Sequence, residues 1–231
     1  MKERDIRDFW LNFSPETTPA TTPIDKNFWS YFSPGDKILE VGSAWGRVIY
    51  ECLARNLAVT GIDINSAEVA NLQRKLKDEG QLDTVGLVLA SATELPFPSQ
   101  AFEGLFLQGL LSALPKDERL ASLREAQRVL KTNGHIHIAE FELNQNDQNA
   151  IERYKSDFEV TGEYGTVSVL NGGGRELFRS HNFRREELID LVESANLDVI
   201  DVQEKIFPTF KLKEKPGIIL TAQKSKIWQT K

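Results

Sequence analysis

The sequence predicts an α/β fold with a seven-stranded, mostly parallel sheet and helices on both faces. Two observations predict it. Short apolar runs alternate along the chain with segments of helical length, as βαβ units require. The apolar runs are also near-continuous, which is typical of strands that are buried on both faces. We expect the last two strands to form an antiparallel hairpin.

The individual elements follow from apolar spacing and from turn residues. The expected strands are apolar runs at 37–41, 58–63, 85–90, 102–108, 135–141, 199–210 and 217–223. The expected helices have apolar residues at helical spacing and cover 47–55, 66–79, 116–130 and 184–195. Ser66 is the expected N-cap of the second helix, and Asn133-Gly134 the left-handed cap after the third. A turn near Lys215-Pro216-Gly217 is expected to close the hairpin.

We expect a single domain of 231 residues in which two separate segments cover the ligand site. Residues 1–30 predict an N-terminal helical cover, and residues 31–143 a cofactor-binding core. Residues 144–183 break the alternation, and they predict a substrate cap with a polar helix and two short strands around a glycine turn. Residues 184–231 complete the sheet.

Composition excludes several classes of function. The single cysteine excludes a disulfide framework and multi-cysteine metal centres, and His135 and His137 lack a third ligand at a fixed spacing, so no metal site is expected. The net charge of −6 gives no general attraction to nucleic acids or anionic membranes. No apolar run approaches a membrane span, and the charged start lacks a signal-peptide core. We expect a cytoplasmic monomer or homodimer whose partner is a small molecule.

The most specific feature is the segment Glu40-Val41-Gly42-Ser43-Ala44-Trp45-Gly46, which ends the first expected strand. An acid ends the strand, glycines follow and a helix begins, at the edge where parallel sheets bind ligands. Asp63 ends the next strand, 21 residues after Gly42, where a carboxylate can accept both hydroxyls of a ribose. A tight turn and a helix cap would explain each feature separately. Together they indicate an adenosine ligand.

The same residues discriminate between adenosine cofactors. A dinucleotide fingerprint requires G-x-G-x-x-G, whereas this register reads Gly42-x-Ala44-x-x-Arg47. Glu40 adds an anion, which suits a cationic ligand better than a pyrophosphate. S-adenosylmethionine carries a sulfonium and an ammonium, and it offers a ribose to Asp63. We therefore expect S-adenosylmethionine as cofactor and S-adenosylhomocysteine as product.

At these residues the sequence resembles the class I S-adenosylmethionine-dependent methyltransferases. It is most similar to the type 11-like members, which methylate small molecules. The first motif of that family reads (Asp/Glu)-x-Gly-x-Gly-x-Gly, and this chain has Glu40-x-Gly42-x-Ala44-x-Gly46. The resemblance runs from about residue 37 to residue 142. It implies a Rossmann-like fold and an enzyme that transfers a methyl group by in-line displacement. The acceptor would be an oxygen or nitrogen, less readily a carbon, of a small molecule.

The resemblance also implies a set of cofactor-binding residues. They are Glu40, Gly42, Ser43, Ala44, Gly46, Asp63, Ile64, Ser91, Ala92 and Gln108. Asp63 would bind the ribose, Ile64 would pack on the adenine, and Gln108 would lie near the methionine or the methyl group. Ser91 replaces an acid that is usual in the family, and Ala44 replaces the middle glycine of the loop.

Catalytic and acceptor-binding residues are expected around the cap. A base is needed only if the acceptor must lose a proton, and His181 and Glu140 are the candidates. A surface or helix-entry position is the plainer interpretation of His181. Tyr164, Phe178 and Arg179 could form the acceptor pocket, or they could only pack the cap onto the core.

Three other functions remain open at this point. Arginines around the cap suggest a tRNA-modifying methyltransferase, although residues 144–231 hold 13 basic and 14 acidic side chains. Ala44 in the glycine loop suggests a protein that binds S-adenosylmethionine without catalysis. A nucleotide-dependent reductase is the weakest alternative, because the phosphate-binding glycines are missing.

Overall fold

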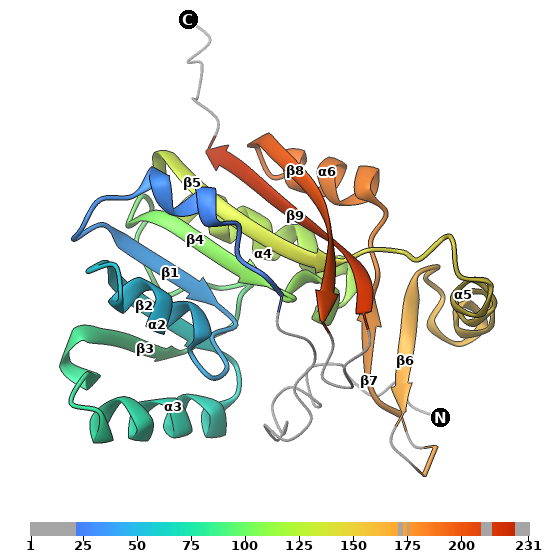
Figure 1. Cartoon of the computed structure of the whole chain (residues 1–231), viewed down its shortest axis with the longest axis horizontal. Helices are drawn as coiled ribbons and strands as arrows, with labels where there is room; N and C mark the ends of the chain where they lie inside the picture. Colours follow the sequence, from blue (N-terminus) through green and yellow to red (C-terminus); the bar gives the residue numbers. More distant parts are fainter. Residues whose placement is uncertain (1–21, 171–172, 175, 209–213, 225–231) are drawn as a thin grey trace, which may run out of the picture.

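The computed structural model describes residues 22–170, 173–174, 176–208 and 214–224. Seven strands form one sheet in the order β3-β2-β1-β4-β5-β9-β8, and β6 and β7 pair separately (Figure 1). The strands are β1 (Lys37–Val41), β2 (Ala58–Asp63), β3 (Val85–Leu89), β4 (Phe102–Gln108), β5 (Leu130–Phe141), β6 (Thr166–Leu170), β7 (Glu176–His181), β8 (Leu197–Pro208) and β9 (Glu214–Lys224). Only β9 runs antiparallel to its neighbours β5 and β8, so the predicted sheet and hairpin are confirmed.

Helices connect these strands and cover both faces of the sheet. The helices are η2 (Lys26–Tyr31), α2 (Arg47–Leu53), α3 (Ser66–Asp78), η3 (Leu82–Thr84), η4 (Leu111–Ala113), α4 (Lys116–Val129), α5 (Gln148–Thr161) and α6 (Arg185–Glu193). None of the helices in the described part of the chain combines the length and the apolarity needed to cross a membrane.

Alternation along the central strands gives each face of the sheet its own core. On β4, Phe106 packs with η2, α2 and α3, whereas its neighbours Leu105 and Leu107 pack with α4 and α6. Successive strand residues point to opposite faces, so a strand buried on both sides must be apolar throughout. This is the physical basis of the near-continuous apolar runs in the sequence.

The two histidines of β5 both contact the short helix η2. His137 is fully buried, and its ring lies edge-on to Phe28 of η2 at 5.1 Å. His135 stacks on Tyr31 of the same helix with ring centroids 3.8 Å apart. Cys52 is a buried residue of α2.

The segment 144–183 contains the predicted secondary structure, a helix and a two-stranded antiparallel ribbon. Helix α5 packs on β6, and β7 packs against η4, the short helix after β4. Figure 1 shows this cap beyond the ends toward which β4 and β5 run. The cap therefore lies at the carboxyl edge of the sheet, where the candidate cofactor residues are also located.

Three local predictions were wrong. The N-cap of α3 is Asn65, not Ser66, because the Asn65 side chain accepts the N–H groups of Ala67 and Glu68. Asn133 does adopt a left-handed φ of 61°, but it lies within β5, since α4 ends at Val129. Lys215-Pro216-Gly217 forms no turn; these residues pair with β8 inside β9.

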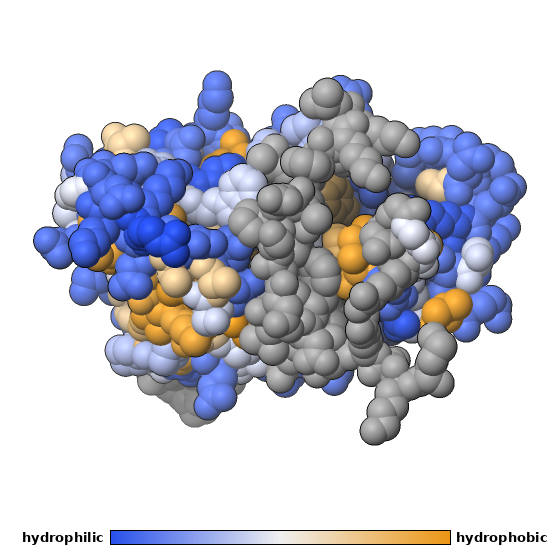
Figure 2. All heavy atoms as spheres, turned by 90° about the horizontal axis from the view of Figure 1, so that it is seen from below, coloured by the Kyte–Doolittle hydropathy of each residue, from blue (hydrophilic) through white to orange (hydrophobic). Residues whose placement is uncertain are grey.

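Residues 1–21 of the predicted N-terminal helical cover lie outside the described residues, and the 3-10 helix η2 forms near its end. The chain enters the described part at Thr22, whose side chain is buried. Viewed from below, the described surface is mostly hydrophilic with small apolar patches (Figure 2). Trp45, in the glycine loop, is one of the large apolar side chains left exposed, at 48%.

Candidate active site

The loop between β1 and α2 bends tightly around the end of β2. The N–H groups of Gly42 and Ser43 both donate to the carbonyl of Ile62, at 2.9 and 2.8 Å. Gly42 and Gly46 have left-handed φ angles of 80° and 77°, and Gly46 is the N-cap of α2. A Cβ on Gly46 would lie 2.8 Å from a methyl group of Leu72, so this position needs glycine for space as well as for conformation.

Ala44 adopts a backbone conformation that suits glycine better than alanine. Its φ is 40°, in the left-handed region. A Cβ in this region crowds the following carbonyl oxygen, which costs roughly 1–2 kcal/mol. The Ala44 N–H donates to Asp63 Oδ2 at 2.9 Å, and this bond holds the residue in place.

Asp63 joins the glycine loop to the start of α3. Its Oδ2 accepts the N–H of Ala44, and its Oδ1 accepts the N–H of Asn65 at 2.9 Å. Burial raises the pKa of Asp63, and these backbone donors oppose the rise. A carboxylate offers about four acceptor positions, so these backbone donors leave room for a hydroxyl group of a ligand.

Glu40 points under α2 and not toward open space. The carboxylate is 4% exposed and accepts the N–H of Ile49 at 3.3 Å. Burial raises the pKa of Glu40 to about 8, although the charge of Arg47 and the N–H groups of Val48 and Ile49 lower it. The acid that begins the motif therefore holds the first turn of α2 in position behind the loop.

Arg47 is a half-buried cation at the methionine end of the expected site. Its Nη2 donates to Gln108 Oε1 at 3.1 Å and to Thr22 Oγ1 at 3.4 Å. Within the described residues it forms no ion pair, and both of these acceptors are uncharged. Burial lowers the pKa of Arg47, and the nearby charge of Glu40 opposes this. A partly desolvated guanidinium with neutral partners favours an anionic ligand group.

Gln108 connects Arg47 to the segment at 22–25, which precedes η2. Its Nε2 lies 2.8 Å from His137 Nδ1, and its Oε1 accepts the hydroxyl of Thr22 at 2.8 Å. The other ring nitrogen of His137 accepts the N–H of Asp25 at 3.0 Å. Burial, with a contribution from Arg47, lowers the pKa of His137 to about 3, so the ring is neutral.

Glu68 is a second buried acid beside Asp63. It is 3% exposed, and its Oε1 has no hydrogen-bond partner in the described part of the chain. Burial raises the pKa of Glu68, and the charge of Asp63 raises it further. A desolvated acceptor without a donor is costly, so this oxygen favours a ligand that brings a donor.

The remaining expected cofactor residues follow β2 and β3. Ile64 is half-buried directly after Asp63. Ser91 comes two residues after β3, and its hydroxyl lies 2.9 Å from Thr93 Oγ1. Ala92 packs on the core below α4. The structure thus brings the glycine loop, Asp63 and Gln108 to one edge of the sheet, while the Ser91 hydroxyl is engaged locally.

Glu140, a candidate base, holds the loop after β4. It is fully buried, and its two oxygens accept the N–H groups of Leu111 at 2.7 Å and Ser112 at 3.1 Å. Burial raises the pKa of Glu140 to about 7, against the lowering by these donors and by Arg119. Its titration range suits a general base, but both oxygens are engaged with backbone.

His181, the other candidate base, is 1% exposed and not on the surface. Its Nδ1 lies 2.9 Å from Thr166 Oγ1, and its Nε2 lies 3.1 Å from Glu187 Oε1. Neither nitrogen has a free lone pair that faces an acceptor molecule. A catalytic role for His181 stays a prediction, and the geometry favours a structural one.

The three expected pocket residues do not share one surface. Phe178 and Arg179 are neighbours on β7, so their side chains point to opposite faces of the ribbon. Phe178 is buried, and Arg179 pairs with Glu176 at 3.2 Å. Tyr164 packs edge-on to Tyr154 within the cap at 5.9 Å. At most one of Phe178 and Arg179 can face the acceptor in this arrangement.

The core of this chain is similar to known methyltransferases. Residues 38–134 match the family model described as a methyltransferase domain. A solved S-adenosylmethionine-dependent methyltransferase from Methanosarcina mazei superposes with a TM-score of 0.82 and 26% sequence identity, over 87% of this chain and 98% of the other. Residues 38–134 are therefore similar to a methyltransferase domain, and the described fold is similar to that of a solved S-adenosylmethionine-dependent methyltransferase.

Curated relatives of the methyltransferase domain have named reactions. A phosphatidylethanolamine N-methyltransferase of Cereibacter sphaeroides is 30% identical over 128 residues, 55% of this chain and 62% of the relative. A ubiquinone/menaquinone biosynthesis C-methyltransferase of Shewanella halifaxensis is 33% identical over 147 residues, 62% of this chain and 52% of the relative. The chain thus spans about half to six tenths of the length of these two relatives.

Sequence reasoning missed Arg47 and Glu68 as site residues. Arg47 directly follows the last glycine of the loop, and this position could have identified it. Glu68 lies four and eight residues before Leu72 and Leu76, so helical spacing places it on the buried stripe of α3. The contact of Thr22 with Gln108 had no signal in the sequence, because 86 residues separate the partners.

We expect Ala44→Gly to stabilise the methyltransferase domain. Glycine adopts the left-handed φ of 40° at this position without strain, so the free energy of unfolding should rise by roughly 1 kcal/mol in urea denaturation. Ala54→Gly is the matched control, because Ala54 has a right-handed φ of −61° at the end of α2 and should lose stability. Equal losses in the two variants would contradict the assigned strain.

We expect the stability of the ligand-free protein to fall between pH 5 and pH 8, partly because of Glu40. Its pKa of about 8 exceeds the ordinary 4.5, so the folded state binds the proton more tightly. This stabilisation is fully present below pH 4.5 and is lost as the pH rises through 8, by up to about 1.4 kcal/mol per pH unit. Glu40→Gln should give a shallower slope in urea denaturation at several pH values. The exposed Asp78→Asn should leave the slope unchanged, and parallel curves for all three proteins would refute the assignment.

Proposed function

We propose that this chain transfers the methyl group of S-adenosylmethionine to a small organic acceptor. The observation that carries the proposal is the Asp63 carboxylate, held by two backbone N–H groups beside the glycine loop. The half-buried Arg47, which forms no ion pair among the described residues, supports it from the other end of the loop.

These residues fit the two ends of the cofactor. Asp63 would accept the ribose hydroxyls, and the unpartnered oxygen of Glu68 offers a further acceptor nearby. Arg47 would pair with the methionine carboxylate, and Gln108 would hold Arg47 in place. Ile64 and Ala92 would pack against the adenine. Glu40 would not contact the cofactor; it would hold the first turn of α2 in position.

We place carbon first among the acceptor atoms, ahead of nitrogen and oxygen. Sequence reasoning had ranked carbon last. The change rests on several curated relatives named as ubiquinone/menaquinone biosynthesis C-methyltransferases. A ring carbon flanked by a phenolic hydroxyl is nucleophilic once that hydroxyl is ionised. The acceptor we propose is therefore an aromatic quinol, and a primary amine is the second candidate because of the N-methyltransferase relative.

The chain would act mainly by positioning its two ligands. The bond from the attacking atom to the methyl carbon forms as the bond from sulfur to that carbon breaks, and the positive charge of the sulfonium disappears. Holding the reacting atoms in line can supply about 7–11 kcal/mol of the barrier reduction. Glu140 and His181 are both engaged in structural bonds, so the chain supplies no obligatory base. The phenolic proton of the quinol passes to solvent before transfer. After transfer, the hydrogen on the methylated ring carbon leaves as a proton and the ring oxygen regains one, so one proton is released overall.

We expect Asp63→Ala to weaken binding of S-adenosylhomocysteine at least tenfold in calorimetry. A hydrogen bond to a charged group contributes roughly 1.5–3 kcal/mol, and the variant loses such an acceptor. Asp83→Ala, an exposed acid before β3, is the control, and thermal unfolding checks that each variant folds. Unchanged affinity in Asp63→Ala would disprove the ribose assignment, and binding of NAD in place of the adenosyl compound would disprove the proposed function.

We expect isotope-labelled methyl groups from S-adenosylmethionine to reach a ring carbon of a quinol. The purified chain is incubated with a quinol that has an unsubstituted ring position and, separately, with vesicles of phosphatidylethanolamine. Mass spectrometry locates the label in each product. Transfer only to the amine would refute carbon as the acceptor atom and would leave methyl transfer intact.

A further inference from the structure

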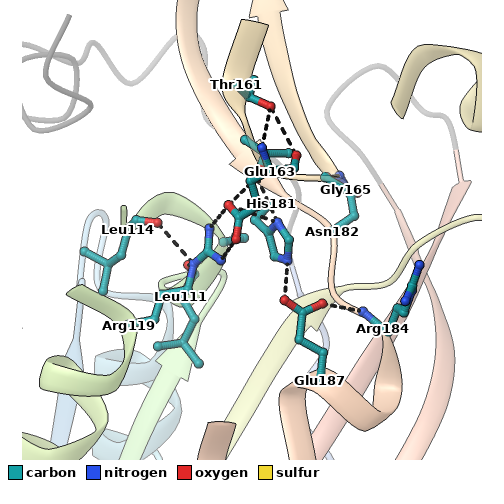
Figure 3. A network of polar contacts seen from close by, with 12 residues as sticks. Leu111, Leu114, Arg119, Thr161, Glu163, Gly165, His181, Asn182, Arg184 and Glu187 are labelled. Atoms are coloured by element: carbon teal, nitrogen blue, oxygen red, sulfur yellow. Dashed lines mark hydrogen bonds and ion pairs between the residues drawn. The ribbon is translucent and has the colours of Figure 1, made fainter. Parts of the chain in front are cut away.

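A network of charged residues, buried at Arg119 and His181 and partly exposed at Glu187, connects the cap to both α4 and α6 (Figure 3). Arg119 of α4 donates two hydrogen bonds to the carboxylate of Glu163, at 2.7 and 2.9 Å. His181, at the end of β7, lies between the two acids, with Nδ1 3.5 Å from Glu163 and Nε2 3.1 Å from Glu187 of α6. We call Arg119, Glu163, His181 and Glu187 the latch.

The hydrogen bonds determine the protonation of the histidine in this arrangement. Thr166 donates its one hydroxyl hydrogen to Glu163 Oε2 at 2.6 Å, so its oxygen must accept from His181 Nδ1. Glu187 Oε1 is a carboxylate oxygen and must accept from Nε2. Both ring nitrogens then carry protons. With two cations and two anions, the latch is electrically neutral only when His181 is an imidazolium.

The same geometry argues against a metal ion between the three ligand-type side chains. One ligand atom from each of Glu163, His181 and Glu187 lies within 4.8 Å of the others. The two acids contact different nitrogens of the His181 ring, however, and one ion could bind through only one of them. Both oxygens of Glu163 already accept from Arg119. A cation site needs several oxygens or nitrogens that converge on one point, and here the guanidinium and the imidazolium already supply the positive charge.

The latch also reaches the loop between β4 and α4, on the acceptor side of the site. Arg119 Nε donates to the carbonyl oxygens of Leu111 and Leu114, at 3.1 and 3.3 Å. The N–H of Leu111 donates to Glu140 from the opposite side. The loop is thus held between a buried acid at the end of β5 and the arginine of the latch.

We propose that the latch couples docking of the cap to the position of the loop at 109–114, and that His181 is a positioning residue that keeps the acceptor half of the site assembled. Charged groups from three elements face the histidine: Arg119 of α4, Glu163 of the turn before β6, and Glu187 of α6. Removal of one partner leaves a buried charge unpaired, which is why a single change should release both the cap and the loop. The effect on acceptor binding rests on the proposed methyl transfer, whereas the coupling itself does not.

The test uses the full chain and the variants His181→Gln and Glu187→Gln. The matched control is Glu186→Gln, an exposed neighbour on α6. Hydrogen exchange followed by mass spectrometry should show faster exchange at 166–170, 176–181 and 109–114 in both latch variants and none in the control. Affinity for S-adenosylhomocysteine should stay within about twofold, while KM for the quinol rises roughly tenfold. If His181→Gln fails to fold, Glu187→Gln, at the more exposed end of the latch, decides the outcome.

A spectroscopic measurement separates positioning from packing alone. The ¹⁵N shifts of labelled histidine should show both nitrogens of His181 protonated while the cap is docked, with the resonance assigned by its loss in His181→Gln. Faster exchange confined to the cap, with 109–114 unchanged, would overturn the coupling. Stoichiometric Zn²⁺ binding that His181→Gln abolishes would overturn the latch in favour of a metal site. If the wild-type chain neither binds S-adenosylhomocysteine nor methylates the quinol, the proposed function is wrong. The hydrogen-exchange measurement still tests the coupling through the latch in that case.

Discussion

Carboxylates with little exposure, on three parallel strands of the sheet, hold the loops of this site. Glu40, near the end of β1, accepts from the first turn of α2; Asp63, at the end of β2, accepts from Ala44 and Asn65; and Glu140, in β5, accepts from the loop after β4. The loops at this edge turn sharply and leave N–H groups unpaired by the sheet. Each acid satisfies such donors where water is excluded, so the site depends on them before any ligand binds.

This arrangement has an electrostatic cost that shapes the site. Burial raises the pKa of all three acids, and only backbone donors and a few cations oppose the rise. Arg47 lies near Glu40 but donates to uncharged Gln108 and Thr22. The proposed methionine end therefore presents a cation and the proposed ribose end presents acids, which matches the polarity of an amino-acid carboxylate joined to a sugar. The acidic balance of the chain comes partly from these internal groups and is not only a property of its surface.

The candidate bases illustrate how far residue type alone can lead. Glu140 and His181 have the chemistry of proton acceptors, yet both are occupied by structural partners. Residue type and order along the chain indicated where they would be, but only their hydrogen-bond partners show what is left to react. For a displacement at a sulfonium carbon this is no deficiency, because alignment and exclusion of water supply most of the catalysis.

The sequence by itself determined the sheet, its antiparallel hairpin, the composition of the cap and the placement of the glycine loop beside Asp63. These follow from local patterns: apolar runs, helical spacing and glycines where the backbone must turn. Only the tertiary structure decided that Ala44 is left-handed, that Glu68 is an unpartnered buried acid, and that His181 lies between two glutamates. Each of these depends on partners brought together by folding, such as Arg119 and Glu163, 44 residues apart. Local spacing cannot encode the partner of a side chain when that partner comes from a distant element of the fold.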